Sequence, residues 1–178
     1  MSCQTREPRQ HCRRIRRRAI RRRPQKRKVR PVLRVQYAAL PYRFPPTEAL
    51  EILLVTTRRS RRWIIPKGWP IKGLRPPKSA AREAFEEAGV RGKIGTKSVG
   101  VFTYDKLLDE HGIQVSCEVK VYPLLVKRQS AVWPEIDQRL VQWFEPGKAV
   151  SLIREKELKA LVAKFARRIA AAAKKPTA

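Results

Sequence analysis

Cysteine, acidic residues and long apolar runs are all scarce in this sequence. The three cysteines, Cys3, Cys12 and Cys117, are odd in number and widely spaced, a pattern that excludes a disulfide framework and a zinc-ligand set. No run of about 18 apolar residues is present, which excludes an obvious membrane-spanning helix. The basic N-terminal stretch also has no apolar core behind it, unlike a secretory signal. We therefore expect a cytoplasmic protein that does not contact a membrane.

The shortage of acids gives the chain an extreme charge. It has 15 Asp and Glu against 42 Lys and Arg, and its formal net charge is +27. Residues 1–30 hold 14 of these cations and a single acid, Glu7. Such a stretch cannot form a packed core, because its charges repel one another and few of its residues are apolar. We predict a disordered basic arm over residues 1–30 and one folded domain over residues 31–174.

The role of the predicted arm has two interpretations. It either binds RNA, DNA or another polyanion by electrostatic attraction, with an affinity that falls as salt rises, or it is a solvated tail. The sequence leaves both open, and it leaves the oligomeric state open as well.

Apolar patterning after residue 31 alternates between strand and helix periods. Strands are predicted at Val32–Leu40, Glu51–Thr57, Trp63–Ile65, Lys93–Tyr104, Val115–Lys127 and Val141–Phe144. A helix is predicted over Pro77–Ala88, and a terminal helix is predicted from one apolar face made of Leu158, Leu161, Val162, Phe165 and Ile169. This order of elements predicts an α+β domain with a mixed β-sheet between helices.

The first predicted helix carries an unusual acidic cluster. Glu83, Glu86 and Glu87 fall at positions i, i+3 and i+4, so their Cβ atoms lie roughly 5–6 Å apart on one face. Arg82 precedes Glu86 by four residues and is placed to orient its carboxylate. Similar charge runs are common on solvated helix faces, so the wider segment has to decide the interpretation.

That wider segment resembles the Nudix box, whose pattern is G-x5-E-x7-R-E-U-x-E-E-x-G-U with U an apolar residue. The matching positions are Gly68, Arg82, Glu83, Ala84, Glu86, Glu87, Gly89 and Val90. Leu74 stands where the pattern has its first glutamate. The resemblance is specific over residues 68–90 and general over roughly residues 31–170. It implies the Nudix-type α/β/α sandwich.

The resemblance also implies a reaction. Nudix hydrolases use divalent ions, here Mg²⁺ or Mn²⁺, to activate water for attack on a phosphoanhydride bond. The implied catalytic side chains include Arg82, and the implied metal ligands are Glu83, Glu86, Glu87 and the carbonyl oxygen of Gly68. Leu74 in place of the outlying glutamate is expected to weaken metal binding or rate by about 10–100-fold without abolishing the site.

Family members also recruit an acid from a downstream loop. Glu135, in the sequence Trp133-Pro134-Glu135, is our candidate for this catalytic acid, in preference to Asp109, Glu110 and Asp137.

Cations around the acidic helix suggest the kind of substrate. Lys67, Lys72 and Arg75 flank the helix and suit the phosphates of a phosphate-dense molecule, although such loop cations are often simply solvated. The segments Pro66–Gly68, Trp133–Glu135 and Gln142–Phe144 look like those of the diphosphoinositol-polyphosphate and dinucleoside-polyphosphate hydrolase branch. A phosphorylated small molecule of that kind is therefore the expected substrate.

Two other functions remain open from the sequence. An RNA 5′-end pyrophosphohydrolase would use the basic arm to hold its substrate. A non-catalytic module that binds polyanions would have lost its chemistry, with Leu74 marking the loss.

Overall fold

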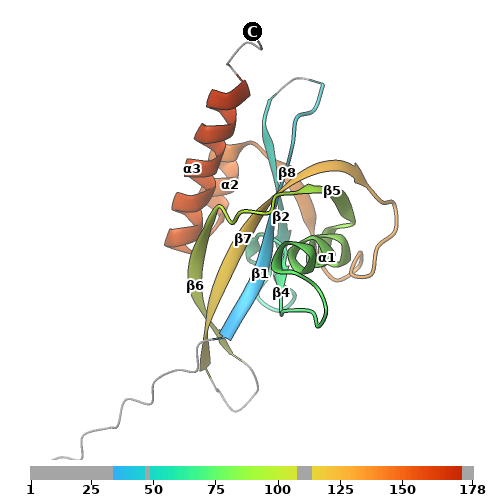
Figure 1. The fold of residues 1–178 in the computed structure, drawn as a ribbon, viewed down its shortest axis with the longest axis vertical. Helices are drawn as coiled ribbons and strands as arrows, with labels where there is room; N and C mark the ends of the chain where they lie inside the picture. The colour runs from blue at the N-terminus through green and yellow to red at the C-terminus, as the bar shows by residue number, and fades with distance from the viewer. Residues whose placement is uncertain (1–33, 47–48, 108–113, 174–178) are drawn as a thin grey trace, which may run out of the picture. The chain divides into compact units, whose positions relative to one another are not determined.

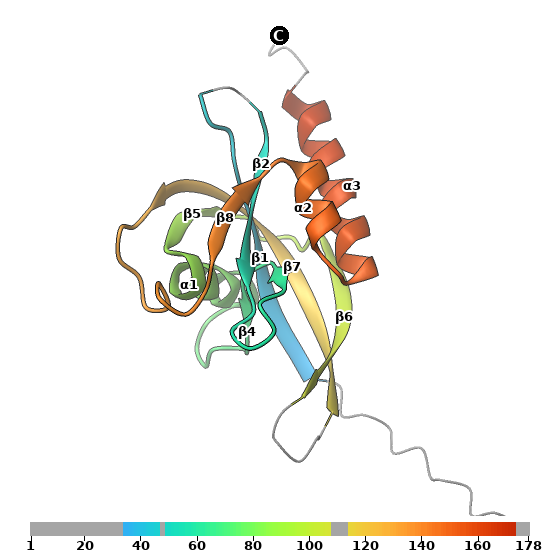
Figure 2. The same ribbon diagram turned by 180° about the vertical axis from the view of Figure 1, so that it is seen from behind.

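The described part of the chain folds as helices packed on both faces of one sheet. The structure is a computed structural model that describes residues 34–46, 49–107 and 114–173. Helix α1 (Pro76–Ala88) covers one face of the sheet, and α2 (Pro146–Leu152) and α3 (Lys156–Ala173) cover the other, as Figure 1 and Figure 2 show from opposite sides. This arrangement confirms the predicted α/β/α sandwich. The predicted arm over residues 1–30 lies outside the described residues.

The sheet is mixed and has eight strands. Its centre is β1 (Arg34–Arg43), which pairs in parallel with β7 (Gln114–Gln129). The other edge of β1 pairs antiparallel with two strands in turn, with β4 (Lys67–Gly68) near its start and with β2 (Glu51–Thr56) at its end. The remaining strands are β3 (Trp63–Ile64), β5 (Val90–Ile94), β6 (Gly100–Leu107) and β8 (Val141–Phe144).

One strand prediction is wrong. The stretch predicted as a single strand over Lys93–Tyr104 forms the end of β5 and most of β6, each antiparallel to β7. Between them lies the segment Gly95-Thr96-Lys97-Ser98, whose residues are typical of a turn. The Gly95 N–H donates to the carbonyl oxygen of Pro123 at 2.8 Å, so the chain remains tied to β7 while it turns. Asp109 and Glu110, two of the alternative candidates for the catalytic acid, lie outside the described residues.

The sequence of helix α1 explains where the helix begins, which face it buries and where it ends. Proline occupies its first position, and Ala80, Ala84 and Ala88 form a fully buried face against the sheet. Gly89 ends the helix with a left-handed φ of 71°, a conformation that favours glycine. Its N–H donates to the carbonyl oxygen of Phe85 at 2.8 Å.

The terminal helix also packs as predicted, since Leu158, Val162 and Phe165 of α3 are buried in the core. The short helix α2 was not predicted. It begins with a proline at its first turn and buries only Ala149, so its apolar signal is too short to show a period. Over the described ranges, no helix is long and apolar enough to cross a membrane.

Candidate active site

Three of the predicted catalytic residues, Glu83, Glu87 and Glu135, meet in a large cavity. The cavity has a volume of about 1050 Å³ and lies where α1, β4 and the loops after β2 and β7 come together. Gly68, Glu83, Glu87, Glu135 and Arg139 all line it. The sequence placed all of these except Arg139 in the site, and the structure brings them together.

Gly68 and Glu83 are in direct contact. A Cβ atom placed on Gly68 would lie 2.0 Å from the carboxyl carbon of Glu83, a distance that real Cβ atoms do not reach. The Glu83 carboxylate therefore packs against the main chain of β4, in space that a side chain at position 68 would fill.

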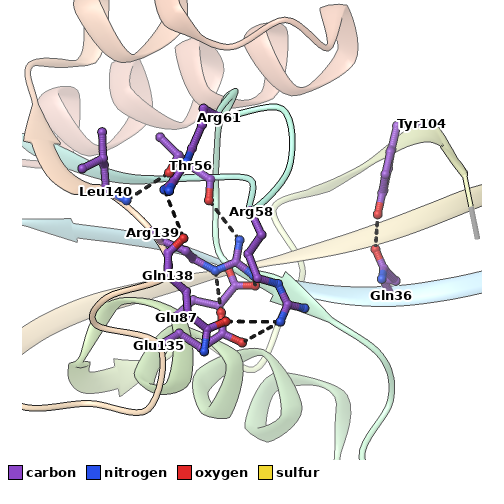
Figure 3. A network of polar contacts seen from close by, with 10 residues as sticks. All are labelled: Gln36, Thr56, Arg58, Arg61, Glu87, Tyr104, Glu135, Gln138, Arg139 and Leu140. Atoms are coloured by element: carbon purple, nitrogen blue, oxygen red, sulfur yellow. Dashed lines mark hydrogen bonds and ion pairs between the residues drawn. The ribbon is translucent and has the colours of Figure 1, made fainter.

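Glu87 is the most buried acid of the site, with 5% of its surface exposed. Its Oε1 lies 2.7 Å from Nη2 of Arg139, which is itself almost fully buried. The same guanidinium donates through Nε to Oε2 of Glu135 at 2.6 Å and through Nη1 to the carbonyl oxygen of Thr56 at 3.0 Å (Figure 3). Arg139 thus joins the helix acid, the loop acid and the end of β2.

Desolvation makes the carboxylates unusually basic. Burial raises the pKa of Glu87 to about 7, with Arg139 and Lys67 opposing the shift and Glu135 and Glu83 adding to it. Burial also raises the pKa of Glu83, and repulsion from Glu86 and Glu135 acts in the same direction. Negative charge is therefore gathered where water is partly excluded, an environment that a bound cation would relieve.

Glu86 points away from the cavity. It forms an ion pair with Arg82, as predicted, and it is absent from the residues that line the cavity. Its carbonyl oxygen accepts a hydrogen bond from the N–H of Glu135 at 3.0 Å. Glu86 thus helps to place Glu135 and adds negative charge near Glu83, while its role as a metal ligand stays a prediction.

The oxygen donors of the site suit a hard divalent ion. The carboxylates of Glu83 and Glu87, together with main-chain oxygen at Gly68, are the ligand types that Mg²⁺ and Mn²⁺ prefer. In the ranges that the structure covers, no three His, Cys, Asp or Glu side chains are close enough to hold an ion together. Arg139 stands between Glu87 and Glu135. The donor chemistry therefore fits such an ion. Binding of the ion by Glu87 would replace the ion pair between Glu87 and Arg139.

The loop between β7 and β8 is fastened to the end of α1. The N–H of Ser130 donates to the carbonyl oxygen of Gly89 at 2.9 Å, and the ring of Trp133 lies against Gly89, where a Cβ would approach it to 2.6 Å. These contacts, with the bond from Glu135 to Glu86, carry Glu135 into the cavity. Asp137, a weaker candidate, is exposed and does not line the cavity.

Of the three predicted phosphate-binding cations, one lines the cavity and two do not. Lys67 lines the cavity, and its Nζ lies 4.6 Å from the centre of the Tyr104 ring. Lys72 and Arg75 are exposed and are not in the lining. Five arginines that line the cavity were not predicted: Arg58, Arg59, Arg62, Arg139 and Arg154. The dense run Arg58-Arg59-Ser60-Arg61-Arg62 between two strands was the available signal.

Leu74 lies in a separate place. It is 44% exposed and lines a smaller pocket of about 260 Å³ with Ala81, Phe85 and Leu124. The residue at the usual position of the first glutamate therefore does not line the large cavity.

Curated relatives identify the family. Nudix hydrolase 16, mitochondrial, of Arabidopsis thaliana is 32% identical over 121 residues, which are 66% of this chain and 67% of that protein. The chain belongs to the Nudix hydrolase family. Diphosphoinositol polyphosphate phosphohydrolase 3-alpha of Homo sapiens is 33% identical over 58% of the Nudix chain and 60% of its own length. The chain also spans 60% of Nudix hydrolase 13, mitochondrial, of Arabidopsis thaliana. No family model matches the sequence.

Solved structures show the same fold. A C. elegans Ap4A hydrolase superposes with a TM-score of 0.55 at 21% identity, covering 78% of the Nudix chain and 99% of the hydrolase. The NUDIX domain of Shewanella oneidensis NrtR, in complex with ADP ribose, superposes with a TM-score of 0.59 at 15% identity, covering 82% and 94% of the two chains.

Proposed function

We propose that this Nudix protein hydrolyses a phosphoanhydride bond in a phosphate-dense small molecule, such as a diphosphoinositol polyphosphate or a dinucleoside polyphosphate, with Mg²⁺ or Mn²⁺. The observation that carries the proposal is the polarity of the cavity. The carboxylates of Glu83, Glu87 and Glu135 line it, and so do Arg58, Arg59, Arg62 and Arg154. Acidic oxygens suit metal ions, and guanidinium groups suit phosphates.

The roles of the residues follow from their positions. Glu83 and Glu87 would hold the divalent ion, with Gly68 supplying main-chain oxygen beside Glu83. When bound, such an ion lowers the pKa of water and neutralises phosphate charge. Glu135, whose N–H donates to the carbonyl oxygen of Glu86, would accept a proton from the attacking water. Lys67 lines the cavity from β4, where its charge would orient the phosphates.

Named relatives support this class of substrate. One is a human diphosphoinositol polyphosphate phosphohydrolase, and a protein of the same fold is an Ap4A hydrolase. The basic lining of the cavity agrees with substrates that carry many phosphates.

A substrate panel tests the proposal. Phosphate release would be measured with diphosphoinositol polyphosphates, diadenosine polyphosphates, ADP-ribose, nucleoside triphosphates and 5′-triphosphorylated RNA, with Mg²⁺ or Mn²⁺ present. We expect turnover on one of the first two classes and its loss by orders of magnitude in Glu87→Gln. Asp137→Asn is the control, since Asp137 is exposed outside the cavity.

Three results would contradict the proposal. Near wild-type turnover in Glu87→Gln would remove the metal assignment. Turnover confined to RNA, and weakened by deletion of residues 1–30, would favour the RNA 5′-end enzyme. Silence of the folded protein on the whole panel would favour the non-catalytic polyanion-binding module.

A further inference from the structure

The basic part of the cavity lining comes from two segments that are distant in sequence. One is the loop between β2 and β3, residues 57–62, which we call the arginine loop. The other is Arg154, in the connection between α2 and α3. An ion pair between Arg62 and Glu155 at 3.5 Å joins the two segments, so Arg154 and the arginine loop belong to one surface of the cavity.

The arginine loop has a defined conformation. The N–H of Thr57 donates to the carbonyl oxygen of Arg62 at 2.9 Å, and the N–H of Arg61 donates to the carbonyl oxygen of Thr57 at 3.1 Å. Thr57 Oγ1 also accepts from the N–H of Arg62 at 3.0 Å. Arg61 takes a left-handed φ of 49° and donates to the carbonyl oxygen of Gln138 at 3.1 Å, which ties the loop to the segment that carries Glu135 and Arg139.

The arginines of this surface differ in their partners. Arg58 lies 3.7 Å from Glu135, and Arg62 is paired with Glu155. Among the described residues, Arg59 and Arg154 have no acidic side chain within ion-pair distance. Both residues are exposed and line the same cavity, so their guanidinium groups are available to bind an anion there.

The size of the cavity also favours an anion bound at Arg59 and Arg154. At about 1050 Å³, it lies at the upper end of the range of small-molecule sites, which is roughly 300–1,000 Å³. A lone diphosphate held at Glu83 and Glu87 would leave much of a cavity of this size unfilled. The lining also includes Tyr104, whose Oη donates to Oε1 of the buried Gln36 at 2.7 Å (Figure 3).

Resting on the proposed function, we propose that Arg59 and Arg154 form a second anion subsite, which binds a phosphate group other than those of the bond that is hydrolysed. The subsite selects substrates that carry phosphate groups in addition to the diphosphate that is cleaved. A molecule whose only phosphates are the diphosphate to be cleaved gains nothing from it.

Binding without catalysis tests the subsite directly. Inositol hexakisphosphate, which has phosphates but no anhydride bond, would be titrated by calorimetry into the full-length protein with a metal chelator present. In Arg59→Ala/Arg154→Ala, its dissociation constant should rise about tenfold or more, the loss of one or two charge-assisted hydrogen bonds. The control is Lys164→Ala/Arg167→Ala, which removes the same charge from exposed positions of α3 outside the cavity and should change the constant by less than about threefold.

Kinetics on the hydrolysed substrate separates binding from the chemical step. Arg59→Ala/Arg154→Ala should raise KM for a diphosphoinositol polyphosphate and leave kcat nearly unchanged, since the subsite holds a phosphate other than those of the cleaved bond. Diadenosine tetraphosphate would show whether an extended polyphosphate reaches the subsite as a compact one does.

Failure of the subsite and failure of the proposed function look different. If the control variant loses as much affinity as Arg59→Ala/Arg154→Ala, or if Arg59→Ala/Arg154→Ala lowers kcat as much as kcat/KM, the subsite is overturned. If no substrate is hydrolysed by the wild type, the proposed function fails, and the calorimetric difference alone then supports or overturns the subsite.

Discussion

The guanidinium of Arg139 lies 2.7 Å from the Glu87 carboxylate. It occupies the position where a cation would bind that acid. Both side chains are almost fully buried. In the metal-free protein Arg139 is therefore the counter-charge of the site, and its loss would leave a buried acid without compensation.

Replacing Arg139 should destabilise the metal-free protein mainly through Glu87. We expect Arg139→Met to lower the free energy of unfolding by about 3–5 kcal/mol at a pH above the pKa of Glu87, which is about 7, the usual cost of removing one partner of a buried ion pair. The same change made in Glu87→Gln should cost clearly less. Urea denaturation of the two single variants and the double variant measures the coupling between the residues. Additive losses would show that Arg139 acts through Glu135 and Thr56 alone.

Glu87 should make the stability of the metal-free protein depend on pH. Its pKa is raised from the ordinary 4.5 to about 7 by burial, so the folded state binds its proton more tightly than the unfolded state does. Stability from this proton is fully present below about pH 4.5 and is lost as pH rises to about 7. Relative to Glu87→Gln, wild-type stability should therefore fall across this window, as measured by denaturation with a chelator. Parallel curves for the two proteins would contradict the shift.

The close contact at Gly68 predicts a loss of function with little loss of fold. In Gly68→Ala, the new Cβ would meet the end of the Glu83 side chain, which can swing aside at small cost to stability. A carboxylate displaced by about 1 Å can cost about 100-fold in turnover, and Mn²⁺ affinity should fall with it. Gly147→Ala is the matched control, because its Cβ would meet nothing within 4 Å. Equal metal affinity in the two variants would show that the contact does not position Glu83.

Two left-handed glycines separate backbone strain from packing. Gly73 and Gly89 have φ values of 82° and 71°, and only Gly89 has a neighbour, Trp133, in the space of a Cβ. Gly73→Ala should cost about 1–2 kcal/mol of strain, whereas Gly89→Ala should cost about 1–3 kcal/mol more, because Trp133 must repack. Denaturant midpoints compare the two. Equal losses of stability in the two variants would mean that the loop between β7 and β8, which carries Trp133, moves away from α1 at little cost.

The sequence predicted most of the fold and the acidic part of the site, for reasons that are local. The alanine face and terminal glycine of α1 and the alternation of β1 and β2 depend on neighbouring residues, and the Nudix pattern ties Gly68 to Glu83 and Glu87 through fixed spacing. The break between β5 and β6 was missed because Lys93–Tyr104 is apolar enough on both sides of its turn to suggest one strand. Arg139 and Arg154 were missed because their positions depend on contacts between distant segments, which no periodic pattern records.

The hydrogen bond from the N–H of Glu135 to the carbonyl oxygen of Glu86 joins two functional segments through backbone atoms alone. A backbone bond of this kind is indifferent to the side chains on either side of it. Residue 135 is therefore held by this bond and by the contact of Trp133 with Gly89, whereas Val132, which is 78% exposed, is free to change. The loop is accordingly where relatives can diverge in sequence, or be altered by design to recognise other substrates, while the acidic part of the cavity keeps its geometry.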